Sequence, residues 1–367
     1  MAELGFGFLR LPMVGEGPEK QVDLDAGKAL VDRFLDAGGR YFDTAYTYLD
    51  GGSETALREC LVERYPRDRY VLTDKIPSWK PVSYADCGRY YEEMRARCGV
   101  AYFDRVLLHW LNADHYAACQ KNGGFDFLRA LKADGKVKEI GFSFHDTADV
   151  LDTILTDHPE VDCVLLQINY LDWDNPAVQS RACYETAVRH NRKILVMEPV
   201  KGGTLAQVPP EAQALMEAAA PGRSPAQWAI GFVRSLPSVE IVLSGMNQPA
   251  QIDANMAAPR EMTEGELEVL ARVRAILQAE KAIPCTGCRY CTSGCPKGIV
   301  IPDYFKLYNA LQRSPGDGWK IRPAFEGLRR QAGAPADCIG CGACQRSCPQ
   351  HLPIIDLLAQ AGAALEK

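Results

Sequence analysis

The 367-residue sequence lacks the features that mark membrane, secreted and nucleic-acid-binding proteins. No apolar stretch approaches the roughly 20 residues that a membrane-spanning helix needs. The first residues contain neither a basic segment nor a long apolar segment, so we expect no signal peptide. The 41 Lys and Arg are outnumbered by 47 Asp and Glu, and a net charge of −6 argues against a general nucleic-acid partner. The sequence therefore predicts a protein of the reducing cytoplasm that acts without a membrane or nucleic acid.

The chain also lacks a G-x-G-x-x-G loop after its first apolar run, which argues against an open dinucleotide-binding sheet. Residues 1–262 instead alternate short apolar runs with helical patterns, and this alternation predicts a parallel sheet. Eight such units fit a closed (β/α)8 TIM barrel of the α/β class. The expected strands are Gly5–Arg10, Arg40–Thr44, Tyr70–Lys75, Asp104–Trp110, Lys136–Phe144, Asp162–Tyr170, Lys193–Val200 and Val239–Gly245.

Cysteine, by contrast, is abundant, and eight of the 14 cysteines form two runs of identical spacing, C-x2-C-x2-C-x3-C-P. This is the ligand spacing of bacterial two-cluster ferredoxins, in which the fourth cysteine of each run ligates the other cluster. Gly340 and Gly342 suit a chain that wraps around a cluster, since glycine takes positive φ without penalty. We therefore expect two [4Fe-4S] clusters. Their ligands would be Cys285, Cys288, Cys291, Cys295, Cys338, Cys341, Cys344 and Cys348.

Two other uses of these eight cysteines stay open. Zinc also binds thiolates, although its sites are usually built from paired C-x2-C knuckles. Disulfides require an oxidising compartment, which nothing in the sequence indicates. Residues 281–367 hold 11 Lys and Arg against 6 Asp and Glu, and two oxidised clusters of charge about −2 each would offset most of that surplus. The charge distribution is thus in keeping with iron–sulfur clusters.

The sequence divides into three parts, which are a barrel at 1–262, a linker helix at 263–280 and a cysteine domain at 281–367. Thr263-x-x-Glu266 has the pattern of a capping box that starts an amphipathic helix. A helical pattern at Pro302–Gln312 lies between the two cysteine runs, in a spacer longer than that of compact β-type ferredoxins. The C-terminal part thereby resembles α-helical ferredoxin modules, and we expect a mainly α-helical two-cluster ferredoxin-like domain.

Four polar side chains stand at the carboxyl ends of three neighbouring strands of the predicted barrel. They are Asp43, Tyr48, Lys75 and His109. Singly, each is more often a solvated rim residue or a structural one. Active sites of such barrels lie at this end, so we expect the four to converge.

These four residues suit proton transfer to a carbonyl oxygen during hydride delivery. A phenol with an ordinary pKa near 10 is too weak an acid at neutral pH. A neighbouring ammonium would lower the pKa of Tyr48, so Lys75 would tune the phenol and Asp43 would hold Lys75 in place. His109 would orient or polarise the carbonyl.

On these residues the chain resembles the aldo-keto reductase family over about residues 5–256, and the cysteine tail is similar to that of the branch with a C-terminal ferredoxin domain. The shared motifs are Phe42-Asp43-Thr44-Ala45-x-x-Tyr48, Lys75, His109, Gly141-Phe142-Ser143, Gln167-Ile168-Asn169-Tyr170 and Gly245 through Asn255. The resemblance implies an oxidoreductase that interconverts a carbonyl and an alcohol with NADPH or NADH. His109 favours C=O over C=C chemistry, because double-bond reductases of the family tend to carry an acid there.

The resemblance also implies where the nicotinamide cofactor binds. Ser143 and Gln167 would hold the carboxamide, Met197 stands where the family places a stacking aromatic, and Gly203 would approach the diphosphate. The adenosine end would be lined by Ser244, Gly245, Gln251 and Asn255.

Several positions depart from the family pattern. Phe144 replaces the usual Asn after the serine, and Glu198 replaces a serine after Met197. The basic residues that grip the 2′-phosphate of NADPH are replaced by Gly245 and Gln251, which tilts the expectation toward NADH or loose cofactor use.

Three functions remain open at this point. The barrel could reduce a carbonyl while the clusters exchange electrons with a ferredoxin or a flavoprotein. It could instead perform nicotinamide-linked chemistry beside purely structural clusters, or serve as an inactive electron-transfer adaptor. A nicotinamide normally passes electrons to a cluster through a flavin, and Lys201-Gly202-Gly203 could bind a flavin phosphate, but diphosphate contacts of a nicotinamide nucleotide explain the same glycines.

Overall fold

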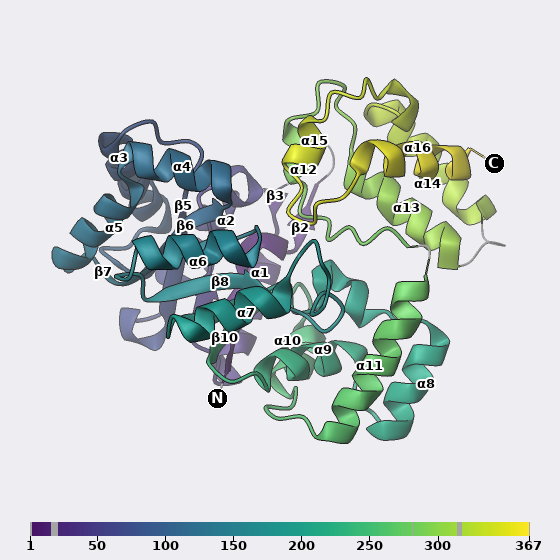
Figure 1. Ribbon diagram of the computed structural model, residues 1–367, viewed down its shortest axis with the longest axis horizontal. Coiled ribbons are helices and arrows are strands. Elements are labelled where there is room, and N and C mark those ends of the chain that lie inside the picture. Colours follow the sequence, from purple (N-terminus) through teal and green to yellow (C-terminus); the bar gives the residue numbers. More distant parts are fainter. Residues whose placement is uncertain (1, 16–20, 281, 314–317, 367) are drawn as a thin grey trace. The chain divides into compact units, whose positions relative to one another are not determined.

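The computed structural model describes residues 2–15, 21–280, 282–313 and 318–366. The chain forms two compact units (Figure 1). One contains residues 1–199 and 226–267, and the other contains residues 200–225 and 268–367.

The first unit is built on a closed barrel of eight parallel strands, which confirms the predicted (β/α)8 fold. All eight expected strands are present, with bounds that differ by a few residues. They are β1 (Glu3–Gly7), β4 (Tyr41–Asp43), β5 (Val71–Pro77), β6 (Phe103–Leu111), β7 (Val137–Phe144), β8 (Cys163–Gln167), β9 (Lys193–Met197) and β10 (Val239–Ser244). A separate antiparallel pair joins β2 (Met13–Val14) to β3 (Gln21–Val22).

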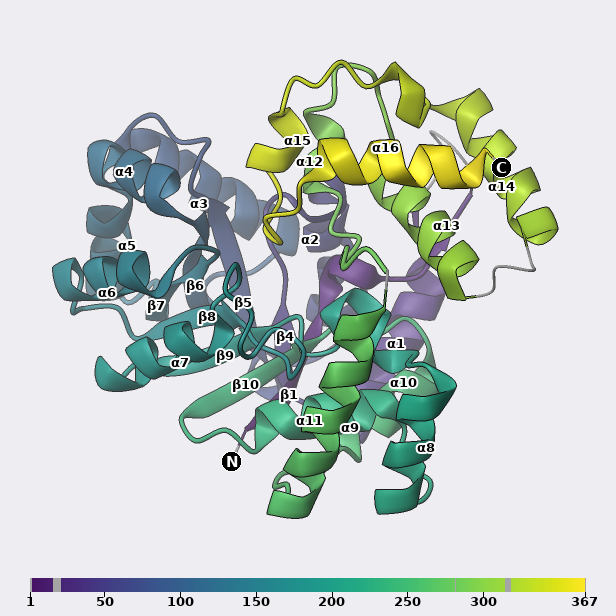
Figure 2. The ribbon, with the colours of Figure 1, turned by 45° about the vertical axis from the view of Figure 1, so that its right-hand side comes forward.

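Helices follow the strands and cover the outside of the barrel (Figures 1 and 2). They are α1 (Leu24–Asp36), α2 (Gly52–Leu57), α3 (Tyr84–Cys98), α4 (Ala113–Asn122), α5 (Gly124–Ala133), α6 (Ala148–Asp157), α7 (Ser180–Arg189), α9 (Pro225–Arg234) and α10 (Pro249–Met256). Shorter helical turns are η1 (Phe8–Arg10), η3 (Tyr48–Gly51), η4 (Arg58–Val62) and η5 (Arg67–Arg69). The alternation of buried strand and half-buried helix explains why the apolar pattern of the sequence predicted these elements.

Apolar side chains from five of the eight strands form a buried cluster in the barrel interior. Its buried members are Tyr41, Leu107, Cys163, Leu165, Leu195, Ile241 and Leu243. Layers of this kind make the barrel a packed core rather than a pore, so the reacting groups must lie at one of its ends.

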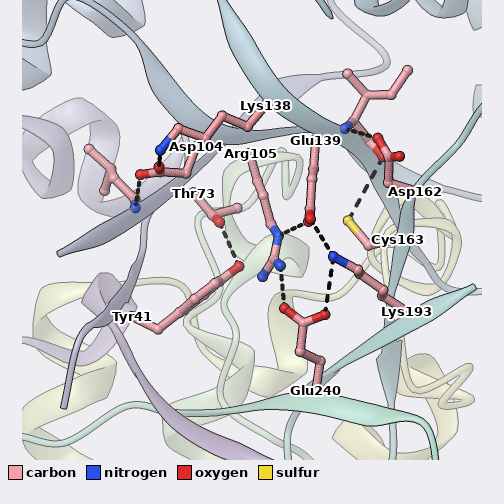
Figure 3. Close-up of polar contacts among 12 residues, drawn as sticks. Tyr41, Thr73, Asp104, Arg105, Lys138, Glu139, Asp162, Cys163, Lys193 and Glu240 are labelled. Carbon is pink, nitrogen blue, oxygen red and sulfur yellow. Dashed lines mark hydrogen bonds and ion pairs between the residues drawn. The ribbon is translucent and has the colours of Figure 1, made fainter. Parts of the chain in front are cut away.

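An ion network lies near the amino-terminal ends of the strands (Figure 3). Arg105, only 5% exposed, donates from Nε to Glu139 at 2.5 Å and also binds Glu240. Lys193 binds the same two carboxylates. Because this end of a (β/α)8 barrel serves stability rather than catalysis, we assign the network a structural role.

The second unit is mainly helical, as predicted (Figure 2). Its elements are η6 (Lys201–Ala206), α8 (Pro210–Ala219), α11 (Glu264–Ala279), α12 (Tyr290–Ser293), α13 (Ile301–Arg313), α14 (Gly318–Gln331), η8 (Pro335–Asp337), α15 (Ala343–Arg346) and α16 (Ile354–Leu365). Its core is an apolar cluster in which Tyr304, Phe305, Phe325 and Leu358 are buried.

The predicted capping box at the start of α11 is confirmed. Thr263 N donates to Glu266 Oε2 at 2.8 Å, and Glu266 N donates to Thr263 Oγ1 at 3.3 Å. The two side chains thus satisfy donors that the first turn of a helix leaves without partners.

The compact units do not follow the predicted boundaries of 1–262, 263–280 and 281–367, because residues 200–225 group with the cysteine domain. Helix α8 of this segment lies beside α11 in both views (Figures 1 and 2). Within the described ranges, no helix is both long and apolar enough to cross a membrane.

Candidate active site and cysteine clusters

Three of the four predicted catalytic side chains meet around one ammonium group. Lys75 Nζ donates to Asp43 Oδ1 at 2.5 Å, to the carbonyl oxygen of Thr44 at 2.8 Å and to the Tyr48 hydroxyl at 3.3 Å. Lys75 is fully buried, and Asp43 is only 2% exposed. A buried ammonium needs such partners, so its position is strongly specified by the fold.

The fourth residue, His109, lies against Tyr48, with 5.5 Å between the two ring centroids. Burial lowers the pKa of His109 well below its ordinary value, and the positive charge of Lys75 lowers it further. The imidazole is therefore neutral at neutral pH and acts as a neutral polar group beside the phenol.

The electrostatics of Tyr48 differ from the sequence prediction. Burial raises the pKa of the phenol well above its ordinary value, and the carboxylates of Asp43, Glu198 and Asp74 raise it further. The prediction that Lys75 lowers the pKa of Tyr48 is wrong, because burial and three nearby carboxylates outweigh the effect of the ammonium. Tyr48 is thus held as a protonated phenol, which is the form that donates a proton.

A β-bulge orients the end of strand β6. The pairing register with β7 shifts between Leu108 and Leu111, and Trp110 has a φ of 63°, in the left-handed region. Trp110 N donates to Ser143 Oγ at 2.7 Å, which ties the bulge to the next strand. Such bulges re-aim side chains next to active sites. This bulge was not predictable from the sequence, since no glycine marks it.

Aromatic rings gather beside His109. Trp79 lies 5.6 Å from the His109 ring and 5.3 Å from Trp110, measured between centroids. His115 stacks on Trp79 at 5.5 Å and an interplanar angle of 26°. Trp79 and Trp110 therefore form one aromatic wall with His115.

The predicted carboxamide contacts lie on the C-terminal ends of β7 and β8. Ser143 is 1% exposed, and Gln167 donates from Nε2 to Asp172 Oδ2 at 3.2 Å. Met197 is paired in register with Gln167 at the end of β9 and is partly buried. These three residues occupy one edge of the barrel.

The predicted adenosine-end residues follow β10. Asn255 Nδ2 donates to Ser244 Oγ at 3.1 Å, and Gln251 Oε1 accepts from the backbone N–H of Asn247 at 2.8 Å. Gly245 is exposed, and a Cβ placed on it would lie 3.0 Å from the Cδ of Arg10. Arg10 thus brings a cation to a region where the sequence indicated none, and its charge also lowers the pKa of Tyr48.

Gly203 lies in η6, in the second compact unit. It has a φ of 101°, and nothing lies within 4 Å of a Cβ built on it. Its predicted diphosphate contact stays a prediction.

A buried group of three side chains, one of them next to Lys75 in β5, was not predicted. Glu54, Asp74 and Cys98 bring their polar atoms within 4.8 Å of one another, and burial raises the pKa of Asp74 well above its ordinary value. Arg97 Nη1 pairs with Glu54 Oε2 at 2.9 Å. Because an arginine already compensates this trio, we assign it a structural role. The one signal in the sequence was an aspartate inside an apolar strand.

The two cysteine runs have the same backbone form. The residues two and four positions after the first cysteine have positive φ in both runs. They are Gly287 (68°) and Arg289 (67°) in one run, and Gly340 (68°) and Gly342 (73°) in the other. The predicted use of Gly340 and Gly342 is confirmed. In the first run the Gly287 N–H donates to Cys285 Sγ at 3.4 Å.

The fourth cysteine of each run lies with the other run. Burial raises the pKa of Cys291, and the nearby thiols of Cys288, Cys285 and Cys348 raise it further. A hollow in the structure is lined by the complementary set, which comprises Cys295, Cys338, Cys341 and Cys344. Two groups of four thiols therefore form, each with three ligands from one run and one from the other. All 14 cysteines lie in the described part of the chain, and none is in a disulfide.

Comparison with models of known protein families identifies the family of the barrel. Residues 3–276, well over half of the chain, match the model of the aldo/keto reductase family. The chain belongs to the aldo/keto reductase family. Residues 284–355 match the 4Fe-4S dicluster domain, so this aldo/keto reductase barrel is followed by an iron–sulfur domain.

Two curated proteins are similar to parts of the chain. A 9,11-endoperoxide prostaglandin H2 reductase of Trypanosoma cruzi (strain CL Brener) is 26% identical over 197 residues, which cover 53% of this chain and 64% of that protein. A pyridoxal 4-dehydrogenase of Microbacterium luteolum is 25% identical over 193 residues, covering 42% and 54%. The chain thus spans less than two thirds of the length of these relatives.

The barrel is also similar to solved aldo/keto reductase structures. One is an aldo/keto reductase from Klebsiella pneumoniae in complex with NADP and acetate. Its TM-score is 0.60 at 21% identity, and the match covers 74% of this chain and 90% of that chain. At this identity the likeness establishes the fold alone.

Proposed function

We propose that the barrel interconverts a carbonyl and an alcohol with a nicotinamide cofactor, and that the C-terminal domain passes electrons through two [4Fe-4S] clusters. The observation that supports this proposal is the convergence of Asp43, Lys75, Tyr48 and His109 at the carboxyl end of the barrel. When bound, the nicotinamide would supply or accept a hydride, and the clusters would carry single electrons.

In carbonyl reduction, Tyr48 donates the proton that the carbonyl oxygen needs as the hydride arrives. Its raised pKa keeps the phenol protonated, so the donor is present at neutral pH. Lys75, hydrogen-bonded to the Tyr48 hydroxyl, stabilises the phenolate that remains, and Asp43 holds Lys75 in place. His109, neutral and next to the phenol, donates a hydrogen bond to the carbonyl oxygen. In the reverse direction Tyr48 accepts the alcohol proton.

The polar residues at the barrel edge fit a nicotinamide nucleotide. Ser143 and Gln167 offer buried polar groups for the carboxamide, and Ser244 with Asn255 offers a hydrogen-bonded pair for the adenosine end. Arg10, beside Gly245, could contact an adenosine phosphate, so the choice between NADH and NADPH stays open.

The two groups of four thiols fit two four-iron clusters, since each group offers one thiolate per iron. Each cluster passes one electron at a time, and two clusters together match the two electrons of a hydride. A ferredoxin or flavoprotein would supply or remove these electrons. Cys341 is exposed and Ile339 beside it is 61% exposed, which supports contact of this group with an external redox partner.

The aromatic wall indicates the substrate class. Trp79, Trp110 and His115 lie next to His109 and offer flat apolar surfaces. We infer that the substrate is a small apolar or aromatic carbonyl compound. The names of the curated relatives, a prostaglandin endoperoxide reductase and a pyridoxal dehydrogenase, are those of oxidoreductases acting on small organic molecules.

Tyr48→Phe tests the proposal. Loss of the proton donor should lower kcat for carbonyl reduction by about 10²- to 10⁴-fold, the usual contribution of a general acid, while nucleotide binding stays unchanged. Tyr46→Phe is the matched control, because it deletes the same group from a neighbouring tyrosine whose hydroxyl donates to Glu93 at 2.7 Å. Steady-state turnover of a carbonyl panel by both variants gives the comparison. Equal turnover by Tyr48→Phe and wild type would overturn the proposed role of the barrel.

A further inference from the structure

The loop after strand β9 is part of the cysteine-containing unit. Lys201 follows Met197, the last residue of β9, by only four positions, yet residues 200–225 group with residues 268–367. A Cβ on Gly202 would lie 2.3 Å from the carbonyl oxygen and 2.7 Å from the Cα of Thr286. The loop therefore packs directly on backbone between Cys285 and Cys288, and only glycine permits that approach.

Lys201 is buried at this junction. It is 2% exposed, and its Nζ donates to Gln350 Oε1 at 3.1 Å. Gln350 is itself 7% exposed and follows Cys348 by two positions. The Lys201 backbone has a φ of 45°, a left-handed conformation that a lysine adopts at some cost. Lys201 is thus held against the group of thiols that contains Cys348.

Lys201 contacts the turn that follows Cys348. Gln350, whose Oε1 accepts the hydrogen bond from Lys201 Nζ at 3.1 Å, lies two positions after Cys348. Cys348 belongs with Cys285, Cys288 and Cys291, so one of the two groups of four thiols has a buried cation beside it. The other group contains the exposed Cys341.

A four-thiolate [4Fe-4S] cluster carries about −2 when oxidised and about −3 when reduced, and its potential depends on net charge, hydrogen bonds and solvent exposure. A fixed cation in a poorly solvated site stabilises the more negative state more, and so favours reduction.

We propose that Lys201 is a positioning residue for electron transfer, which raises the reduction potential of the cluster held by Cys285, Cys288, Cys291 and Cys348 above what its ligands alone would give. This inference rests on the proposed cluster ligation and not on the proposed carbonyl chemistry. It makes the loop after β9, which the sequence suggested for phosphate binding, part of the electron-transfer domain.

The test is a redox titration of the full-length, cluster-loaded protein followed by EPR, without nucleotide or substrate. Lys201→Met removes the charge but keeps the length of the side chain, and Lys201→Arg keeps the charge. Lys297→Met is the matched control, because Lys297 is exposed and adjoins the Cys295-Pro296 pair of the other group.

In Lys201→Met we expect one of the two cluster midpoints to fall. At a fixed potential the ratio of reduced to oxidised cluster should drop about tenfold, which for a one-electron couple is 59 mV. Lys201→Arg should stay near wild type, and Lys297→Met should change little because water and salt screen an exposed charge. If Lys201→Met does not retain its clusters, Lys201→Gln replaces it, and we expect the same fall in one cluster midpoint.

No shift in Lys201→Met would overturn the proposal. Equal shifts in Lys201→Met and Lys201→Arg would overturn it too, since they would show that packing rather than charge sets the potential. Because no turnover is measured, these outcomes are independent of Tyr48→Phe, which tests the barrel chemistry.

Discussion

At the scale of single residues, the active site is defined by two opposite shifts in pKa. Burial raises the pKa of Tyr48 well above its ordinary value near 10 and lowers the pKa of His109 well below its ordinary value near 6.5. Both residues are therefore neutral across the usual working range. In the proposed reduction, neutral Tyr48 would donate the proton, and neutral His109 lies beside it.

We expect the pH profile of kcat/KM to show no change that reports the titration of His109. Lowering the His109 pKa moves its protonation to more acidic pH, and raising the Tyr48 pKa moves loss of the donor to more alkaline pH. We predict that kcat/KM for carbonyl reduction stays level from about pH 6 to about pH 9, because the shifted pKa values of His109 and Tyr48 both lie outside this range. A decline on the acid side with an apparent pKa near 6.5, absent in a His109→Gln variant, would contradict this account.

The convergence of Asp43, Tyr48, Lys75 and His109 was predictable from the sequence, but their electrostatics were not. Each of Asp43, Lys75 and His109 ends or nearly ends a strand, and parallel strands bring such ends together. The pKa of Tyr48 instead depends on burial and on Glu198 and Asp74, whose distances from the phenol no sequence pattern gives. Arg10 went unnoticed for the same reason, since it approaches Gly245 only in the fold.

At the scale of elements, the conformation of η6 is constrained by its close approach to the backbone of Thr286. Gly202 and Gly203 have φ values of 64° and 101°, but only Gly202 faces backbone, at Thr286. Gly202→Ala should therefore reduce the iron and acid-labile sulfide bound per chain, since the new methyl group displaces the loop that carries Cys285 and Cys288.

Gly203→Ala is the control for backbone strain. It places alanine at positive φ, at a cost of roughly 1 kcal/mol, but meets nothing within 4 Å. It should keep close to the wild-type content of iron. Equal losses in the two variants would show that strain, and not contact with Thr286, links η6 to the cysteine loops.

Regular elements were predicted well and irregular ones poorly. All eight strands that the apolar runs predicted are present in the barrel. The bulge at Trp110 and the group assignment of residues 200–225 were not predicted, because both depend on tertiary contacts and leave no periodic pattern.

At the scale of the whole molecule, each of the two groups of four thiols combines cysteines from both runs of the C-terminal domain. One proposed cluster takes Cys348 from the second run, and the other takes Cys295 from the first. This crossing brings residues more than 40 positions apart in the sequence into each site.

Paired double variants test the crossing. Cys285→Ala with Cys348→Ala should affect a single cluster and leave about half of the iron and one EPR signal. Cys285→Ala with Cys295→Ala removes the same number of ligands from one run of the sequence but should affect both clusters. The reverse result would mean that each run ligates its own cluster.

The central claim is that the barrel transfers a hydride between nicotinamide and a carbonyl carbon. The most direct measurement is the transfer of deuterium from C4-deuterated NADH and NADPH to the product alcohol, read by mass spectrometry, with wild-type protein and with Tyr48→Phe. We predict deuterium on the former carbonyl carbon with at least one of the nucleotides, formed at a rate that falls with the loss of the Tyr48 hydroxyl. A reduced product that carries no deuterium from either nucleotide, or one formed equally fast by Tyr48→Phe, would contradict the account.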